Sequence, residues 1–155
     1  MLRRLMLAAI GSVALAVSAP AFAQGQSGTA AEAKAMIEKA VTELKANQAV
    51  ALAKFNKADS GFRDRDLYAF CFDTTTGIRT AHVILEFLGK DIRPLKEKDG
   101  SPLGQKIFDA ANKVKEGEIT TVNYNFPRPG SSDPIAKETY ITRVGDQGCG
   151  VGYYK

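Results

Sequence analysis

The fold is decided by the stretch GEITTVNYNFPRPG, residues 117–130, and by the shorter stretch KETYI, residues 137–141. The first stretch is rich in β-branched and aromatic residues and ends at two prolines and a glycine, and the second has the same β character. Together they predict two strands of an antiparallel hairpin. The strands carry Lys137, Tyr124 and Tyr140, which offer one cation and two phenols to whatever packs against them.

The segments around this hairpin predict an α+β domain. Leu67–Asp73 has the aromatic enrichment of a buried strand, and Ile78–Ile84 is expected to return as its hairpin partner. Residues 103–115 show apolar residues at helical spacing and end before Gly117, and a last strand is expected at 149–154. The order of two strands, a helix and three strands favours an antiparallel sheet with five strands.

A long helix is expected before the sheet. Thr29 and Glu32 have the spacing of a capping box at its start. Apolar residues then recur at helical spacing: Ile37, Val41, Leu44, Ala51, Leu52 and Phe55. The pattern predicts one helix from Thr29 to about Lys57, about 40 Å long, part of which would protrude or pair with another helix.

The N-terminal residues have the pattern of a cleaved export signal. Arg3 and Arg4 precede the apolar stretch Leu5–Val17, and small residues follow at the −3 and −1 positions of a cleavage site after Ala23. A retained membrane anchor is the alternative, but a membrane span needs about 20 apolar residues. We therefore expect a signal peptide over residues 1–23, cleavage between Ala23 and Gln24, and a periplasmic or secreted location.

The expected cleavage reduces the net charge of the protein. The full chain has 21 Lys and Arg and 17 Asp and Glu, a net charge of +4, and removal of Arg3 and Arg4 leaves 19 against 17, a net charge of +2. This charge is too small for a nucleic-acid interface. The remaining length is typical of one domain, expected at residues 33–155 after a flexible leader at residues 24–32.

The chain has two cysteines, Cys71 in the first expected strand and Cys149 at the start of the last. An oxidising compartment permits a disulfide between them if these strands are neighbours. Two buried free thiols are the alternative, and the sequence does not choose between the two interpretations. The cysteines do not form a Cys-x-x-Cys pair, so a thioredoxin-like redox site is not expected.

The order of several short motifs resembles a single Cache domain of the second type. The motifs are Tyr68–Asp73 with its glycine turn, Ala81-His82, Leu88–Asp91, the hairpin quoted above and the closing Gly150–Tyr153. The resemblance covers residues 33–154 and implies a PAS-like fold, in which a long N-terminal helix precedes a five-stranded antiparallel sheet. It also implies a small ligand on the concave face of that sheet, because the family mostly forms the extracytoplasmic sensors of chemoreceptors and histidine kinases, and many members are associated with small carboxylates.

A buried carboxylate must be paired or hydrogen-bonded, and the chain offers groups for this at the positions that resemble the family's pocket. The expected ligand contacts are Lys137 as counter-charge, His82, Tyr68, Tyr124 and Tyr140 as hydrogen-bond donors, and Phe126 as an apolar wall. Two positions depart from the family pattern: Val83 stands where Pro often follows the histidine, and Phe126 stands in place of a common Trp. The identity of the ligand is therefore not carried over.

Each of these residues also has a simpler interpretation. A lone histidine at a strand end is commonly solvated, and lysines are common on exposed strand edges. Strand tyrosines are often core rings with the hydroxyl at the surface. Arg79 is expected to pair with an acidic residue across the strands, and Arg128 is expected to be exposed.

An enzyme is not expected. The only histidine, His82, lacks a Ser or Cys nucleophile motif, and one histidine with scattered acids is poor material for a metal site. No cofactor is expected either. The sequence predicts an exported domain that binds a small organic acid and presents it to a membrane receptor kinase, chemoreceptor or transporter. The alternative is a structural or partner-binding protein that forms a homodimer through the long helix without a small ligand.

Overall fold

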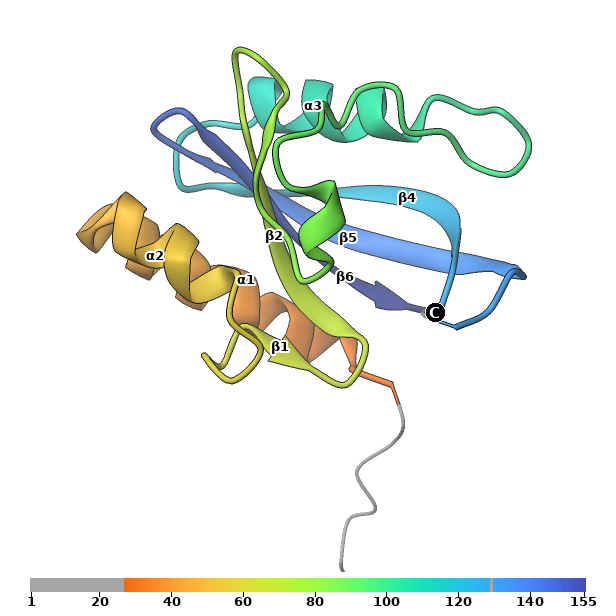
Figure 1. Cartoon of the computed structure of the whole chain (residues 1–155), viewed down its shortest axis with the longest axis horizontal. Coiled ribbons are helices and arrows are strands. Elements are labelled where there is room, and N and C mark those ends of the chain that lie inside the picture. Colours follow the sequence, from red (N-terminus) through yellow and green to blue (C-terminus); the bar gives the residue numbers. More distant parts are fainter. Residues whose placement is uncertain (1–26, 129) are drawn as a thin grey trace, which may run out of the picture.

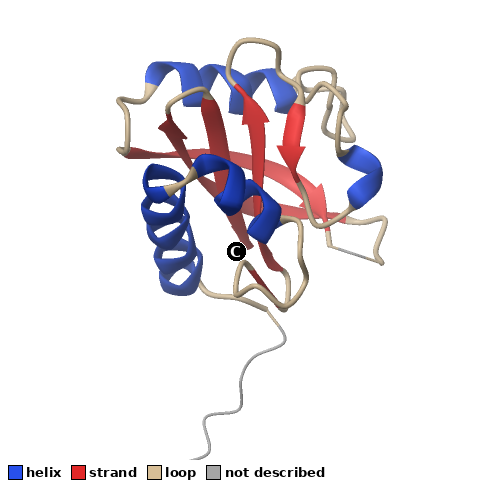
Figure 2. Ribbon diagram, turned by 60° about the vertical axis from the view of Figure 1, so that its left-hand side comes forward, coloured by secondary structure: helices blue, strands red, loops and turns tan. Residues whose placement is uncertain are grey.

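The computed structural model describes residues 27–128 and 130–155, which form an antiparallel sheet with helices on both faces (Figures 1 and 2). The strands are β1 (Arg63–Asp64), β2 (Leu67–Asp73), β3 (Arg79–Ala81), β4 (Ile119–Pro127), β5 (Pro134–Val144) and β6 (Gln147–Tyr154). The helices are α1 (Ala30–Ala46), α2 (Gln48–Phe55) and α3 (Leu103–Lys113), with one 3-10 turn, η1 (Leu85–Phe87). The expected signal peptide and its cleavage site between Ala23 and Gln24 lie outside the described residues.

The strand order is β1-β2-β6-β5-β4, and β3 pairs with β2. The hairpin predicted at residues 117–141 is the β4–β5 pair, in register from Ile119 opposite Thr142 to Pro127 opposite Pro134. The predicted α+β class and antiparallel sheet are confirmed. The sheet also includes the two-residue strand β1, and β3 is shorter than the expected 78–84 strand.

The predicted single helix is two helices that meet at Asn47. This residue has an extended backbone (φ −163°, ψ 103°), and its side chain accepts a hydrogen bond of 3.1 Å from the Val50 N–H, so it ends α1 and caps α2. Both helices contact the sheet and each other, and the prediction of one helix of about 40 Å was wrong. The capping box of Thr29 and Glu32 is present, and α1 therefore begins inside the segment expected to be a flexible leader.

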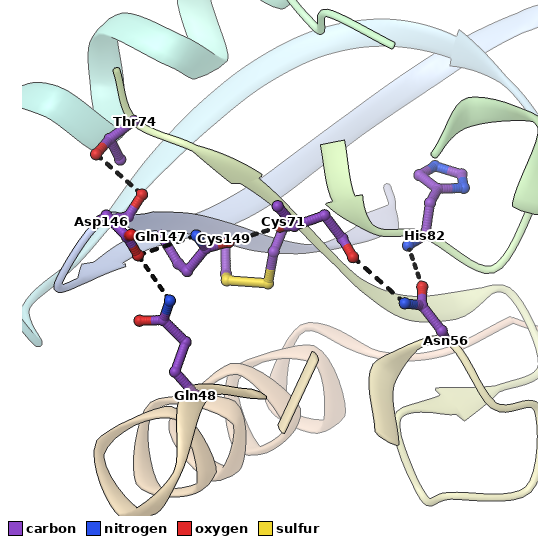
Figure 3. The surroundings of a disulfide bond; sticks show 9 residues. Gln48, Asn56, Cys71, Thr74, His82, Asp146, Gln147 and Cys149 are labelled. Carbon is purple, nitrogen blue, oxygen red and sulfur yellow. Dashed lines mark hydrogen bonds between the residues drawn. A yellow bond between two sulfur atoms is a disulfide. The ribbon is translucent and has the colours of Figure 1, made fainter. Parts of the chain in front are cut away.

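One face of the sheet packs against α1 and α2. The buried side of α1 consists of Ala33, Ile37, Ala40 and Leu44, and it meets small and aliphatic residues of the strands. On this face Cys71 and Cys149 are direct cross-strand partners and form a disulfide (Figure 3). This bond joins β2 to β6 in the middle of the sheet.

The other face of the sheet is covered by α3 and by the chain between β3 and α3. Here β6 contributes Gly148, Gly150 and Gly152 over most of its length, before Tyr154 near its end. A Cβ on Gly150 would lie 2.5 Å from the ring of Phe70, and one on Gly148 would lie 2.7 Å from the ring of Phe72. Because β6 is bare on this face, the aromatic rings of β2 can lie across it.

No helix within residues 27–128 and 130–155 is long and apolar enough to cross a membrane.

Candidate ligand-binding site

A cavity of about 70 Å³ lies on the α3 side of the sheet. Its walls come from β2, β3, β4, α3 and residues 82–95, and most of them are apolar, as with Phe70, Phe87, Ile107 and Phe126. One ordered water needs about 10–15 Å³, whereas pockets for drug-sized ligands are about 300 Å³ or larger. The cavity therefore suits a few waters or a ligand with only a few non-hydrogen atoms.

Arg79 on β3 places a cationic group in the wall of this cavity. The residue is 8% exposed, and its guanidinium donates one hydrogen bond of 3.3 Å to the carbonyl of Asp91 and lies 5.3 Å from the ring centre of Phe87. The carboxylate of Asp91 is instead paired with Arg93 at 2.6 Å. Burial lowers the pKa of Arg79, although the nearby charge of Asp91 opposes this shift. Within the described chain, most of the guanidinium's donors have no partner.

This placement corrects the expectation that Arg79 pairs with an acid across the strands. Arg79 was not among the ligand contacts predicted from the sequence. The available signal was a charged side chain in a strand immediately before Ala81-His82, a position that was already expected to approach the ligand.

His82 follows β3 and also lines the cavity. Its backbone N–H donates to the Asn56 side-chain oxygen at 2.9 Å (Figure 3), and its Nδ1 accepts from the Ile84 N–H at 2.9 Å. Nδ1 therefore carries no proton, and the neutral ring holds its proton on Nε2. Burial, together with the charge of Arg79, lowers the pKa of His82 to about 4. At neutral pH the ring is thus an uncharged donor, and no described residue accepts from Nε2.

Two tyrosines complete the polar part of the wall. Tyr124 on β4 shares a hydrogen bond of 2.7 Å with the hydroxyl of Thr139, so its own hydroxyl is already engaged. Tyr68 on β2 lies with its ring centre 5.3 Å from that of His82, and its hydroxyl has no partner in the described part of the chain. Burial raises the pKa of both tyrosines, which keeps both hydroxyls protonated. Phe126, next to Tyr124 on the same face, also lines the cavity.

Lys137 on β5 is buried beside the cavity but does not line it. It is 2% exposed, and its Nζ lies 4.5 Å from the ring centre of Tyr154, 5.0 Å from that of Tyr68 and 5.9 Å from that of Phe126. Its hydrogen bond to the Tyr154 hydroxyl is long, at 3.5 Å. Burial lowers the pKa of Lys137 to about 8. The ammonium group of Lys137, the predicted counter-charge, therefore packs against two aromatic rings of the wall, whereas Arg79 is part of the wall itself.

Tyr140 lies on the opposite face of the sheet. Its ring stacks on that of Tyr153 with centres 5.9 Å apart, and it packs against the core beneath α1. Successive strand residues point to opposite faces, and its neighbours Thr139 and Ile141 take the cavity side. This placement contradicts the predicted contact between Tyr140 and the ligand.

No family model matches the sequence, and no curated protein matches it. Solved structures do match. A methyl-accepting chemotaxis protein from Vibrio parahaemolyticus RIMD 2210633 is similar at 24% identity and a TM-score of 0.63, over 80% of this chain and 86% of that chain. A periplasmic sensor domain of a chemotaxis protein is similar at 19% identity and a TM-score of 0.59, over 79% of this chain and 87% of that one.

A third similar structure is a Cache chemosensory domain described as recognising carboxylic acid. It shares 21% identity with a TM-score of 0.57, over 79% of this chain and 85% of that chain. All three are described as chemotaxis proteins or sensor domains, none as an enzyme. The structure thus confirms the fold that the sequence motifs suggested: this chain has the fold of a Cache domain.

Proposed function

We propose that the protein is an extracytoplasmic sensor domain that binds a small carboxylate in the cavity between the sheet and α3. The observation that carries the proposal is Arg79: a guanidinium in a mostly apolar wall that has no ion pair with any described residue and only one hydrogen bond to them. A carboxylate would supply the missing charge and accept two parallel hydrogen bonds from the guanidinium. Burying a cation without such a partner costs free energy, and a bound anion would offset this cost.

The neighbouring groups fit the same ligand. Among the described residues, the Nε2–H of His82 and the hydroxyl of Tyr68 have no acceptor, both lie in the same wall as Arg79, and Lys137 adds positive potential from behind Tyr68. None of the described residues that form the wall is acidic, so the ammonium group of an amino acid would find no carboxylate partner there. The proposed ligand is therefore a short acid without an amino group.

The proposal extends to location and partner. We propose that residues 1–23 direct export and are removed after Ala23, and that residues 33–155 act as one sensor domain for a membrane receptor or transporter. The similarity to chemotaxis sensor domains supports this setting. The alternative, dimerisation through the N-terminal helix, gains no support from α1, because its apolar side faces the sheet and its outward positions include exposed Lys34, Glu38 and Lys45.

A thermal-shift panel tests the proposed function. The protein is heated with acetate, propionate, succinate, alanine and, as a neutral control, propionamide. A ligand at 100 times its dissociation constant stabilises the fold by about 2.7 kcal/mol, which raises the melting temperature of a domain this size by about 6 °C or more. We expect such a rise with acetate or propionate and none with propionamide or alanine.

The matched variants are Arg79→Gln and Arg63→Gln. Arg63 is an exposed arginine on β1 and serves as the control for removing a positive charge from the chain. The Arg79→Gln protein should lose the shift while the Arg63→Gln protein keeps it. The proposed site is wrong if no acid on the panel stabilises the wild-type protein, or if the Arg79→Gln protein responds as strongly as the wild type.

A further inference from the structure

The chain enters the domain at Ser27 and Gly28, beside β1 and the start of β2 (Figure 1), and two charged side chains hold it there. The Gly28 N–H donates to one oxygen of Asp66 at 2.6 Å, and Arg128 donates to the other at 2.9 Å. Arg128 also donates to the hydroxyl of Ser27. The side chain of Asp66 is 9% exposed and that of Arg128 is 33% exposed, so the carboxylate is buried while the guanidinium keeps contact with solvent. We call these four residues the N-terminal latch.

The latch is a specific packing arrangement. A Cβ on Gly28 would lie 2.1 Å from the side chain of Leu67, so a larger residue at this position would have to displace that side chain. Beside it, Arg65 has a left-handed backbone (φ 55°), which is uncommon for a residue with a side chain. Its guanidinium donates to the Ser27 carbonyl at 3.1 Å and pairs with Glu32 at 2.6 Å, and these contacts offset the local strain.

The latch lies at the ends of two strands that form the wall of the ligand cavity. Asp66 immediately precedes β2, which carries the wall residue Tyr68, and Arg128 immediately follows β4, which carries the wall residue Phe126. Each of these strands thus connects a latch residue directly to the cavity wall.

Lys137 and Tyr154 fill the space between the cavity wall and the latch. The guanidinium of Arg128 lies 4.6 Å from the ring centre of Tyr154, whose hydroxyl donates to the Pro127 carbonyl at 2.8 Å. The same hydroxyl accepts from Lys137, whose Nζ lies against the rings of Tyr68 and Phe126. If the ring of Tyr68 or Phe126 moves, the environment of the buried Lys137 ammonium group changes. Lys137 contacts Tyr154, and Tyr154 contacts Arg128 of the latch.

We propose that the latch is coupled to the cavity. A ligand that holds the rings of Tyr68 and Phe126 in place stabilises the hydrogen bonds of the latch, which Asp66 and Arg128 form with Ser27 and Gly28. The inference rests on the proposed function, because it describes how occupancy of that same site is passed to the point where the chain enters the domain. Coupling between two sites is reciprocal. If the ligand stabilises the latch by a certain factor, disruption of the latch must lower the affinity for the ligand by the same factor.

Isothermal titration with acetate tests the coupling in the full chain. The Arg128→Gln protein breaks the latch without changing any residue of the cavity wall, and the Arg63→Gln protein is again the charge control. Coupling energies of this kind correspond to an affinity loss of about three- to tenfold. We expect that loss for Arg128→Gln and no change for Arg63→Gln. In the wild type, acetate should slow hydrogen exchange of the Gly28 amide, measured by NMR. Equal acetate affinity in wild-type and Arg128→Gln proteins would overturn the inference while leaving the proposed function intact.

A second variant tests the coupling even if acetate does not bind. Phe126→Leu changes a wall ring and leaves every latch residue in place. In the ligand-free protein it should speed exchange of the Gly28 amide at least threefold, whereas the amide of Leu44, on the other side of the sheet, should be unaffected. An unchanged Gly28 exchange rate would show that the latch is independent of the cavity. Absence of acetate binding together with faster Gly28 exchange would instead reject the proposed ligand and support the coupling.

Discussion

The two faces of the sheet are built from the same strands but differ in whether their charged side chains have partners within the protein. Toward α1 and α2, the strands present mostly small and aliphatic side chains, a disulfide and the stacked rings of Tyr140 and Tyr153. Toward α3, they present aromatic rings over glycines, and the buried cations Arg79 and Lys137 have no carboxylate partner among the described residues. The first face is a structural core. On the second face a bound anion would pair with these cations, and the proposed ligand site rests on this difference.

The largest expected effect falls on the structural face. The disulfide closes a sequence separation of 78 residues, and its removal in a Cys71→Ala, Cys149→Ala double variant should lower the free energy of unfolding by about 2–5 kcal/mol. Urea denaturation measures the loss. Acetate affinity at a temperature where the variant is folded should match that of the wild type. A variant as stable as the wild type would show that this face depends less on the cross-link than its position suggests.

The bare strand on the cavity face gives the next effect. In Gly150→Ala the new methyl group would meet the ring of Phe70 at 2.5 Å, so the ring must shift into the cavity. Overpacking of this kind costs about 1–3 kcal/mol of stability. Ligand affinity should fall as well, which distinguishes this variant from changes on the α1 face. Unaltered affinity would mean that Phe70 does not shape the site.

The pH dependence of stability tests the environment of His82. Its pKa is about 4 in the folded protein and about 6.5 in the unfolded chain, so between these values the unfolded chain binds the proton more readily. Stability should therefore fall as pH decreases from about 6.5 toward 4, by about 2 kcal/mol between pH 6.5 and 5. This range lies above the usual titration of the carboxylates. Guanidinium denaturation at several pH values should show a smaller slope for His82→Gln, and an equal slope would contradict the buried, neutral state of the ring.

The smallest effect concerns the break between α1 and α2. Asn47→Ala removes the hydrogen bond to the Val50 N–H and should cost about 1 kcal/mol of stability, measured by urea denaturation. Ligand affinity should not change, because α2 lies on the structural face. A stabilised variant would indicate that the two helices prefer to join into the single helix suggested by the sequence.

Local patterns in the sequence were enough to predict most of the fold. Alternation and turn residues gave β2, β4, β5 and β6 within about two residues, because each of these strands has one face of consistent character. The helix break at Asn47 was missed, since asparagine in a helical pattern becomes a cap only when the next helix must turn to follow the sheet. The contacts of α2 with β2 and β3 supply that requirement.

The site was less predictable than the fold. Motif order pointed to His82, Tyr68, Tyr124 and Phe126, and all four line the cavity. Tyr140 was misplaced because a one-residue step along a strand reverses the face, and the face of this strand depends on its register with β4 and β6. Arg79 was overlooked because a buried cation without a partner looks, in sequence, the same as a surface arginine.

The most direct test of the account is a crystal structure of the protein grown with propionate. We expect the carboxylate in the cavity, with an oxygen about 2.7–2.9 Å from the guanidinium of Arg79 and a second contact from His82 Nε2. The methyl end should point toward the apolar wall. A carboxylate bound on the other face of the sheet, or a cavity without ligand in a protein that propionate stabilises, would contradict the assignment of the functional face.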